Sequence, residues 1–189
     1  MSWEKIGGSF LHNANLPFHE YGHVVFSMFG DLVMLLGGSM FQIIVPLGLM
    51  FFFILKQRDN FAASIMLWWT GQNFIDVSPY IADAPLRALP LVGNKGPESH
   101  DWWNILSMTG QLDLAGFYAG FSFLVGALIL ILSNVWGAYL LWVEASGRIR
   151  QAHNPALFQD TYERENKGHE GDRKKVTGNR GASKSIYRV

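Results

Sequence analysis

Residues 32–55 read LVMLLGGSMFQIIVPLGLMFFFIL, a run of 24 residues without a charged side chain. A helix needs about 20 apolar residues to cross the hydrocarbon core of a bilayer, whereas buried helices of soluble proteins have apolar runs of about 10–14 residues. Residues 114–143 form a second uncharged run, 30 residues long. The two runs therefore predict an all-α integral membrane protein.

A third apolar segment, residues 61–84, is interrupted by polar groups. It opens FAASIMLWW and then contains Gln72, Asn73, Asp76 and Asp83. An ionisable side chain inside an apolar segment is costly in a bilayer and by default marks a functional position. We interpret this segment as a transmembrane helix that contributes polar groups to a site, which makes about three full transmembrane helices.

The segment before the first uncharged run is shorter. Residues 16–30 offer about 15 membrane-compatible residues. This length favours a short or re-entrant helix, and a complete span from about Ser9 is the alternative. Glycines at Gly30 and at Gly37-Gly38 predict breaks that let the backbone turn before the first full span. Irregular backbone at membrane depth is tolerated only where protein shields it or water reaches it.

Charge divides the chain into two parts. Residues 1–143 carry five Lys/Arg against nine Asp/Glu, and residues 144–189 carry ten against six. We therefore predict a membrane-embedded helical domain over residues 1–143 and an extended, polar, basic tail over residues 144–189. Basic connections face the cytoplasm, so the tail and the loop that holds Lys56 and Arg58 are predicted to be cytoplasmic. The chain has no cysteine, which excludes disulfides and thiolate metal sites.

The short segment contains LPFHEYGHVVF, in which His19, Glu20 and His23 form the pattern H-E-x-x-H. On a helix, positions i and i+4 share a face, so both imidazoles can direct a nitrogen at one Zn²⁺. Glu20 lies beside the first ligand, where it reaches a water molecule as general base. Zinc lowers the pKa of water that it binds to about 7. The pattern predicts a zinc site with His19 and His23 as metal ligands and Glu20 as the catalytic residue.

A catalytic zinc needs a third protein ligand and an open fourth position. The segments GQNFIDVSPYIADA and SHDWW supply candidates, among them Asp76, Asp83 and His100. Asp76 and Asp83 are two helical turns apart, which places them near one face of a continuous helix. The structural alternative is that either carboxylate caps a helix or pairs with Arg87.

The sequence FHEYGHVVF, followed by LGGSMFQIIVPLG and by a later Asn…Pro…Asp segment, resembles the site-2-protease-like intramembrane zinc metallopeptidases. It also resembles small bacterial membrane proteins grouped with that family. The resemblance covers about residues 16–84 and implies that an aspartate from a later transmembrane segment completes the zinc site. Carried over, Asp83 is the third ligand and Asn73 orients the substrate. The family usually has Asp-Gly there, whereas Asp83 precedes Ala84, so the two other candidates stay open.

Two functions are expected. The first is a zinc endopeptidase of the bacterial inner membrane that hydrolyses peptide bonds within or near the bilayer. The second is a catalytically retired, peptidase-like accessory subunit of a larger membrane complex, such as a respiratory or photosynthetic one. Its spans and its tail would contact other subunits, and the 14 Phe and 7 Trp favour this role. A transporter ranks third because the chain shows no internal repeat.

The basic tail raises a further question of partners. It adjoins a predicted span and has no interleaved aromatic side chains, which nucleic-acid binding would favour. Anionic lipid headgroups or a protein partner are therefore expected, and nucleic acid is not.

Overall fold

A computed structural model of the protein describes residues 9–91 and 96–153, with side chains described as far as residue 147. Within these residues every regular element is helical and no strand is present, which confirms the predicted all-helical class. The elements in chain order are α2 (Phe10–Phe26), η1 (Ser27–Phe29), α3 (Asp31–Phe52), the π-helical turn η2 (Phe53–Gln57), α4 (Asn60–Ala82), η4 (Pro97–Ser99), α5 (Asp101–Met108), η5 (Leu112–Leu114) and α6 (Ala115–His153).

The chain divides into two compact units, Met1–Leu140 and Leu141–Val189. The site described below lies wholly in the first unit. The predicted boundary between residues 143 and 144 stays a prediction. Of the predicted tail, residues 144–153 continue α6, and residues 154–189 lie outside the described residues.

Two helical stretches, Asp31–Gln57 and Leu112–Gly147, are long and apolar enough to cross a membrane. They correspond to the two uncharged runs of the sequence. The third predicted span forms α4, a helix of 23 residues. Its polar residues make α4 less apolar than these two stretches, and it is not among the helices apolar enough to cross a membrane. The third span therefore stays a prediction. The helix that carries H-E-x-x-H, α2, has 17 residues.

One of the two predicted glycine breaks is present. Gly30 has a φ of +90°, a conformation that few other residues adopt, and it ends the turn between α2 and α3. The predicted break at Gly37-Gly38 is wrong, because α3 runs through both residues as one helix. These glycines allow close packing instead. A Cβ built on Gly37 would lie 2.8 Å from the carbonyl oxygen of Gly22 in α2.

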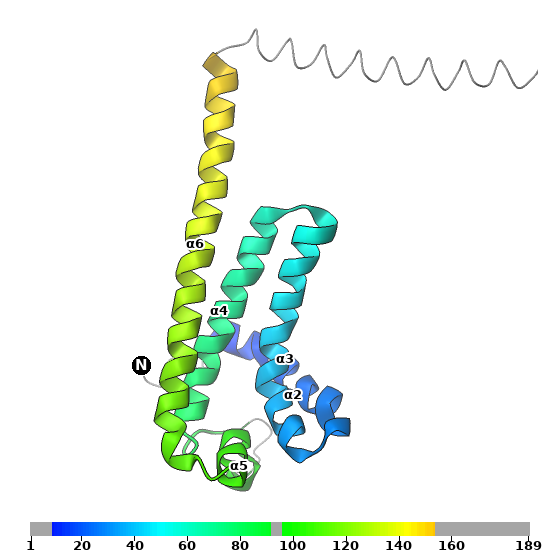
Figure 1. Cartoon of the computed structure of the whole chain (residues 1–189), viewed down its shortest axis with the longest axis vertical. Coiled ribbons are helices and arrows are strands. Elements are labelled where there is room, and N and C mark those ends of the chain that lie inside the picture. The colour runs from blue at the N-terminus through cyan, green and yellow to red at the C-terminus, as the bar shows by residue number, and fades with distance from the viewer. Residues whose placement is uncertain (1–8, 92–95, 154–189) are drawn as a thin grey trace, which may run out of the picture. The chain divides into compact units, whose positions relative to one another are not determined.

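Figure 1 shows α3 and α4 as antiparallel neighbours, with α2 crossing near the start of α3 and α5 lying beneath the end of α4. The part of α6 in the first unit packs on α4 through a second pair of glycines. A Cβ on Gly126 would lie 2.6 Å from the carbonyl oxygen of Gly71, so the two helix backbones are in contact. Small residues at such crossings are typical of helix pairs in membranes.

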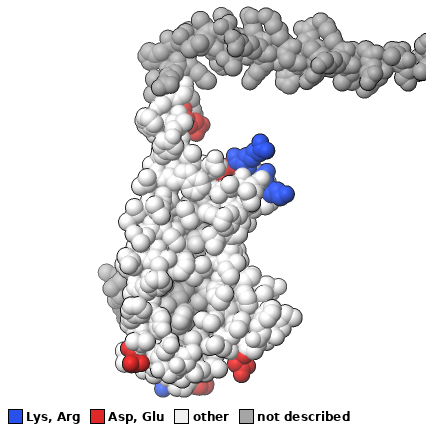
Figure 2. All heavy atoms as spheres, viewed as in Figure 1, with Lys and Arg blue, Asp and Glu red and all other residues white. Residues whose placement is uncertain are grey.

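Charged side chains of the first unit lie at its two ends on the face shown in Figure 2, and an uncharged belt separates them. Lys56 and Arg58 belong to the turn between α3 and α4, which Figure 1 shows at one end of the unit. This distribution suits a helical unit whose middle contacts lipid, since charged groups are expensive in the hydrocarbon core.

Candidate functional site

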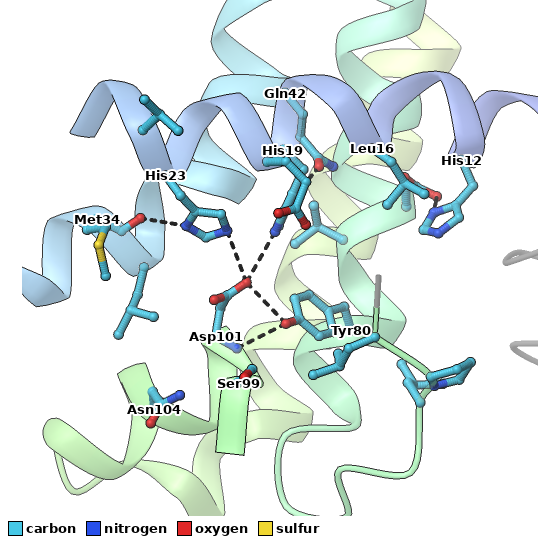
Figure 3. Close-up of a pocket in the computed structure, with 18 residues that line it drawn as sticks. His12, Leu16, His19, His23, Met34, Gln42, Tyr80, Ser99, Asp101 and Asn104 are labelled. Carbon is cyan, nitrogen blue, oxygen red and sulfur yellow. Dashed lines mark hydrogen bonds and ion pairs between the residues drawn. The ribbon is translucent and has the colours of Figure 1, made fainter. Parts of the chain in front are cut away.

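One face of α2 carries the two histidines of the H-E-x-x-H motif together with His12 and Leu16. His12, Leu16, His19 and His23 recur at the three- and four-residue spacing that keeps side chains on one side of a helix. In Figure 3 all four point from α2 toward the same space. They line a cavity of about 450 Å³, and Glu20 lines it with them. The predicted helical register of the motif is therefore present.

Asp101, the first residue of α5, completes a cluster with the two histidines of the motif. Its Oδ2 lies 3.2 Å from Nε2 of His19 and 3.3 Å from Nε2 of His23. One ligand atom from each of the three side chains falls within 4.8 Å of the other two. The dashed lines in Figure 3 converge on this carboxylate oxygen.

The other ring nitrogens of the two histidines are already engaged. Nδ1 of His23 donates to the carbonyl oxygen of Met34 at 2.8 Å, and Nδ1 of His19 donates to Oε1 of Gln42 at 3.0 Å. A carbonyl oxygen only accepts hydrogen bonds, so the proton of a neutral His23 must sit on Nδ1. The lone pair of Nε2 then faces the Asp101 carboxylate. The repulsion between the Nε2 atoms and the carboxylate oxygen is removed either by one additional proton on each imidazole or by one metal cation bound between them. A metal-bound histidine usually donates a hydrogen bond through its other ring nitrogen, as both histidines do here.

A glycine of α3 leaves room beside the two Nε2 atoms. A Cβ built on Gly38 would lie 2.6 Å from Nε2 of His19 and 2.6 Å from Nε2 of His23. Any side chain at this position would occupy space next to both ligand atoms. The cluster is thus bounded on this side by a residue that has no side chain.

Asp101 is held in place by Tyr80 of α4. The Tyr80 hydroxyl donates to Oδ2 of Asp101 at 3.1 Å and accepts from the backbone N–H of Asp101 at 3.0 Å. Burial acts to raise the pKa of the Asp101 carboxyl, but in the metal-free protein hydrogen bonds from the protonated His19 and His23 rings outweigh it and hold that pKa well below its usual range. Asp101 is therefore ionised at neutral pH and is available as an anionic ligand.

Asp83 and His100, both predicted as candidate third ligands, contact each other instead of the histidine pair. Oδ2 of Asp83 lies 3.4 Å from Nε2 of His100, and its two carboxylate oxygens accept from the backbone N–H groups of Ala88 and Leu89 at 3.1 and 3.0 Å. Asp83 is the C-cap residue of α4, and its side chain closes the turn that follows. This role agrees with the helix-capping alternative for Asp83.

His100 is fully buried and caps α5. Its Nδ1 accepts from the backbone N–H of Trp103 at 3.2 Å, and its ring packs on Tyr80 with centroids 4.3 Å apart. Burial lowers the pKa of His100, so it stays neutral. Together with Asp83 it fixes the start of α5, and thereby the position of Asp101.

The two remaining predicted residues lie elsewhere on α4. Asp76 lines the cavity, where its Oδ1 accepts from Nδ1 of His12 at 3.0 Å. Asn73, predicted to orient the substrate, is fully buried and its Nδ2 donates to the carbonyl oxygen of Trp69 at 2.9 Å. It does not line the cavity.

Sequence reasoning named the segment that holds Asp101 but not the residue itself. The signal was present, because an acidic residue directly follows a histidine in SHDWW. Comparison of the sequence with protein-family models, with curated proteins and with solved structures finds no match.

Proposed function

We propose that the protein is a membrane-embedded zinc metallopeptidase, with His19, His23 and Asp101 as the zinc ligands and Glu20 as the general base. The observation that carries the proposal is the convergence of the three ligand atoms within 4.8 Å, on a cavity that Glu20 also lines. The residues come from two elements far apart in the sequence, α2 and α5. Burying several polar groups together is unfavourable, and one bound metal ion would account for all three.

The donor set fits zinc. Two imidazole nitrogens and one carboxylate oxygen are a usual ligand set of catalytic zinc, which leaves one position for a water molecule or substrate. Mg²⁺ and Ca²⁺ prefer oxygen ligands, and the chain has no cysteine that would favour softer metals.

The chain supplies the remaining parts of a hydrolytic site. A zinc ion held there would polarise a peptide carbonyl and make water acidic. The Glu20 carboxylate would accept the proton of the attacking water and return it to the leaving amine. Leu16, Val77 and Leu89 give the cavity apolar lining. The Tyr80 hydroxyl keeps the Asp101 carboxylate in one orientation.

We also propose the placement in the membrane. α3 and α6 cross the bilayer, α4 crosses beside them, and α2 enters part of the way. The basic turn with Lys56 and Arg58 and the end of α6 face the cytoplasm. This arrangement puts the cavity near the side of the membrane opposite that turn, where α5 lies.

The test is a comparison of Glu20→Gln with the wild type in detergent, with Glu98→Gln as the matched control. Glu98 is exposed and does not line the cavity. We expect wild type and Glu98→Gln to cleave apolar peptides and Glu20→Gln to bind zinc without cleaving. A Glu20→Gln protein as active as wild type would contradict the proposal. Zinc bound by all three proteins, with cleavage by none, would favour the accessory-subunit role.

A further inference from the structure

A second polar pair lies on the cavity, away from the three zinc ligands. His12 donates from Nδ1 to Oδ1 of Asp76 at 3.0 Å, and Asn15 donates from Nδ2 to Oδ2 of the same carboxylate at 3.1 Å. The side chain of Asp76 is 4% exposed and that of His12 is 14% exposed. Both residues line the cavity (Figure 3 labels His12).

The pair is held by further polar groups of α2 and α4. Oδ1 of Asn15 accepts from the indole N–H of Trp69 at 2.9 Å, and Nδ2 of Asn15 also donates to Gln72 at 2.9 Å. Asn15 itself is 1% exposed. A connected network of this kind holds its members in one geometry, because each broken bond would leave a buried polar group unpaired. The side chains of Asp76 and His12 are therefore held in one orientation at the wall of the cavity.

The cavity is acidic. Three carboxylates line it, from Glu20, Asp76 and Asp101, whereas no Lys or Arg is among its described lining residues. A zinc ion would offset charge at the Asp101 end. At the Asp76 end, His12 is the one side chain among the described lining residues that can supply positive charge. A substrate group placed there is favoured if it donates hydrogen bonds and carries positive charge.

Helix geometry gives the spacing between the two ends. His12 precedes His19 by seven residues, which corresponds to about 10 Å along α2. An extended peptide covers about 10 Å with three residues. The cavity has about 450 Å³, which accommodates an extended segment of this length.

We propose that the cavity takes an extended peptide segment with a cationic side chain, Lys or Arg, about three residues from the cleaved bond, and that the His12–Asp76 pair binds this side chain. The inference rests on the proposed peptidase function. The hydrogen-bond network also ties α2 to α4, and a purely structural role would predict no preference for substrate charge.

The experiment uses three apolar peptides that differ at one position, with Lys, norleucine or Glu, and the position is moved along the peptide on both sides of the bond. The quantity compared is the ratio of kcat/KM for the Lys and norleucine peptides in the same sample. The amount of folded enzyme cancels in this ratio, so a partly unfolded variant can still be tested. The variants are Asp76→Asn and His12→Gln, and Asp113→Asn is the control because Asp113 is exposed and does not line the cavity.

In wild type we expect the Lys peptide to exceed the norleucine peptide by about tenfold at one position, about three residues from the bond, and the Glu peptide to be the poorest. The ratio should fall to about one in Asp76→Asn and drop in His12→Gln, and stay unchanged in Asp113→Asn. Equal cleavage of the three peptides by wild type, or an unchanged ratio in Asp76→Asn, would overturn this inference and leave the peptidase function standing. Cleavage of no peptide would overturn both.

Discussion

The Tyr80 hydroxyl and Asp101 are joined by two hydrogen bonds, one to the carboxylate at 3.1 Å and one from the backbone N–H at 3.0 Å. This double contact links the third zinc ligand of our proposal to α4, a helix that contributes no ligand itself. Partners that orient metal ligands in this way typically change metal affinity by about 10–100-fold when they are removed.

Replacement of Tyr80 by phenylalanine should therefore weaken zinc binding without abolishing it. We expect the Kd for zinc to rise by about 10–100-fold in Tyr80→Phe, measured by competition with a chromophoric chelator. Tyr118→Phe is the matched control, because this substitution also removes a tyrosine hydroxyl, one that donates to Gln111 outside the cavity. Equal zinc affinity in the two variants would show that Tyr80 does not position Asp101.

Alanine at Gly38 should block the metal site by volume alone. The added Cβ would lie 2.6 Å from Nε2 of both His19 and His23, so the imidazoles would have to move. We expect Gly38→Ala to retain its helix content by circular dichroism and to bind only a small fraction of the wild-type zinc. Gly48→Ala in the same helix is the control, since nothing lies within 4 Å of a Cβ there. Full zinc binding by Gly38→Ala would contradict the proposed ligand geometry.

His100 should make the metal-free protein less stable in mild acid. Burial lowers its pKa below the ordinary value of 6.5. Above pH 6.5 the residue is neutral in both the folded and the unfolded chain and contributes no pH dependence. As the pH falls below 6.5 toward the lower folded pKa, His100 becomes protonated in the unfolded chain while it stays neutral in the folded chain. The free energy of unfolding therefore decreases. Asp83 and Asp101 oppose this shift because their charge favours the protonated ring.

The measurement is the Tm in detergent with a chelator, for wild type and His100→Gln, between about pH 7.5 and about pH 5.5. Wild type should lose more of its Tm on acidification than the variant does. Parallel pH profiles would mean that His100 is not held neutral by its surroundings.

The sequence predicted the helices better than it predicted which side chains lie together in the candidate site. Uncharged runs longer than a bilayer core identify α3 and α6, since few other structures tolerate them. The i, i+4 spacing of His19 and His23 places both on one face of α2, because helical geometry alone decides it. The Gly37-Gly38 pair was misread as a break. Glycine lowers helix propensity, but here close packing on α2 and the space beside the imidazoles outweigh that local preference.

The third carboxylate could not be assigned from spacing. Asp83 and Asp101 are both acidic residues outside the motif, and the choice between them depends on how the chain returns after α4. Asp83 closes that return by accepting from the N–H groups of Ala88 and Leu89, and His100 caps the helix that follows. These turn and cap contacts, and the longer-range bond between Tyr80 and Asp101, have no periodic signal in the sequence. Together these contacts place Asp101 beside the histidines.

Zinc content per chain tests the central claim most directly. Wild type, His23→Ala, Asp101→Ala and the exposed-residue control Asp113→Ala would be purified in detergent, supplied with zinc, freed of excess metal and measured by elemental analysis. The account predicts about one zinc per chain in wild type and in Asp113→Ala, and none in His23→Ala or Asp101→Ala. Wild-type protein without zinc, or Asp101→Ala with as much zinc as wild type, would contradict it.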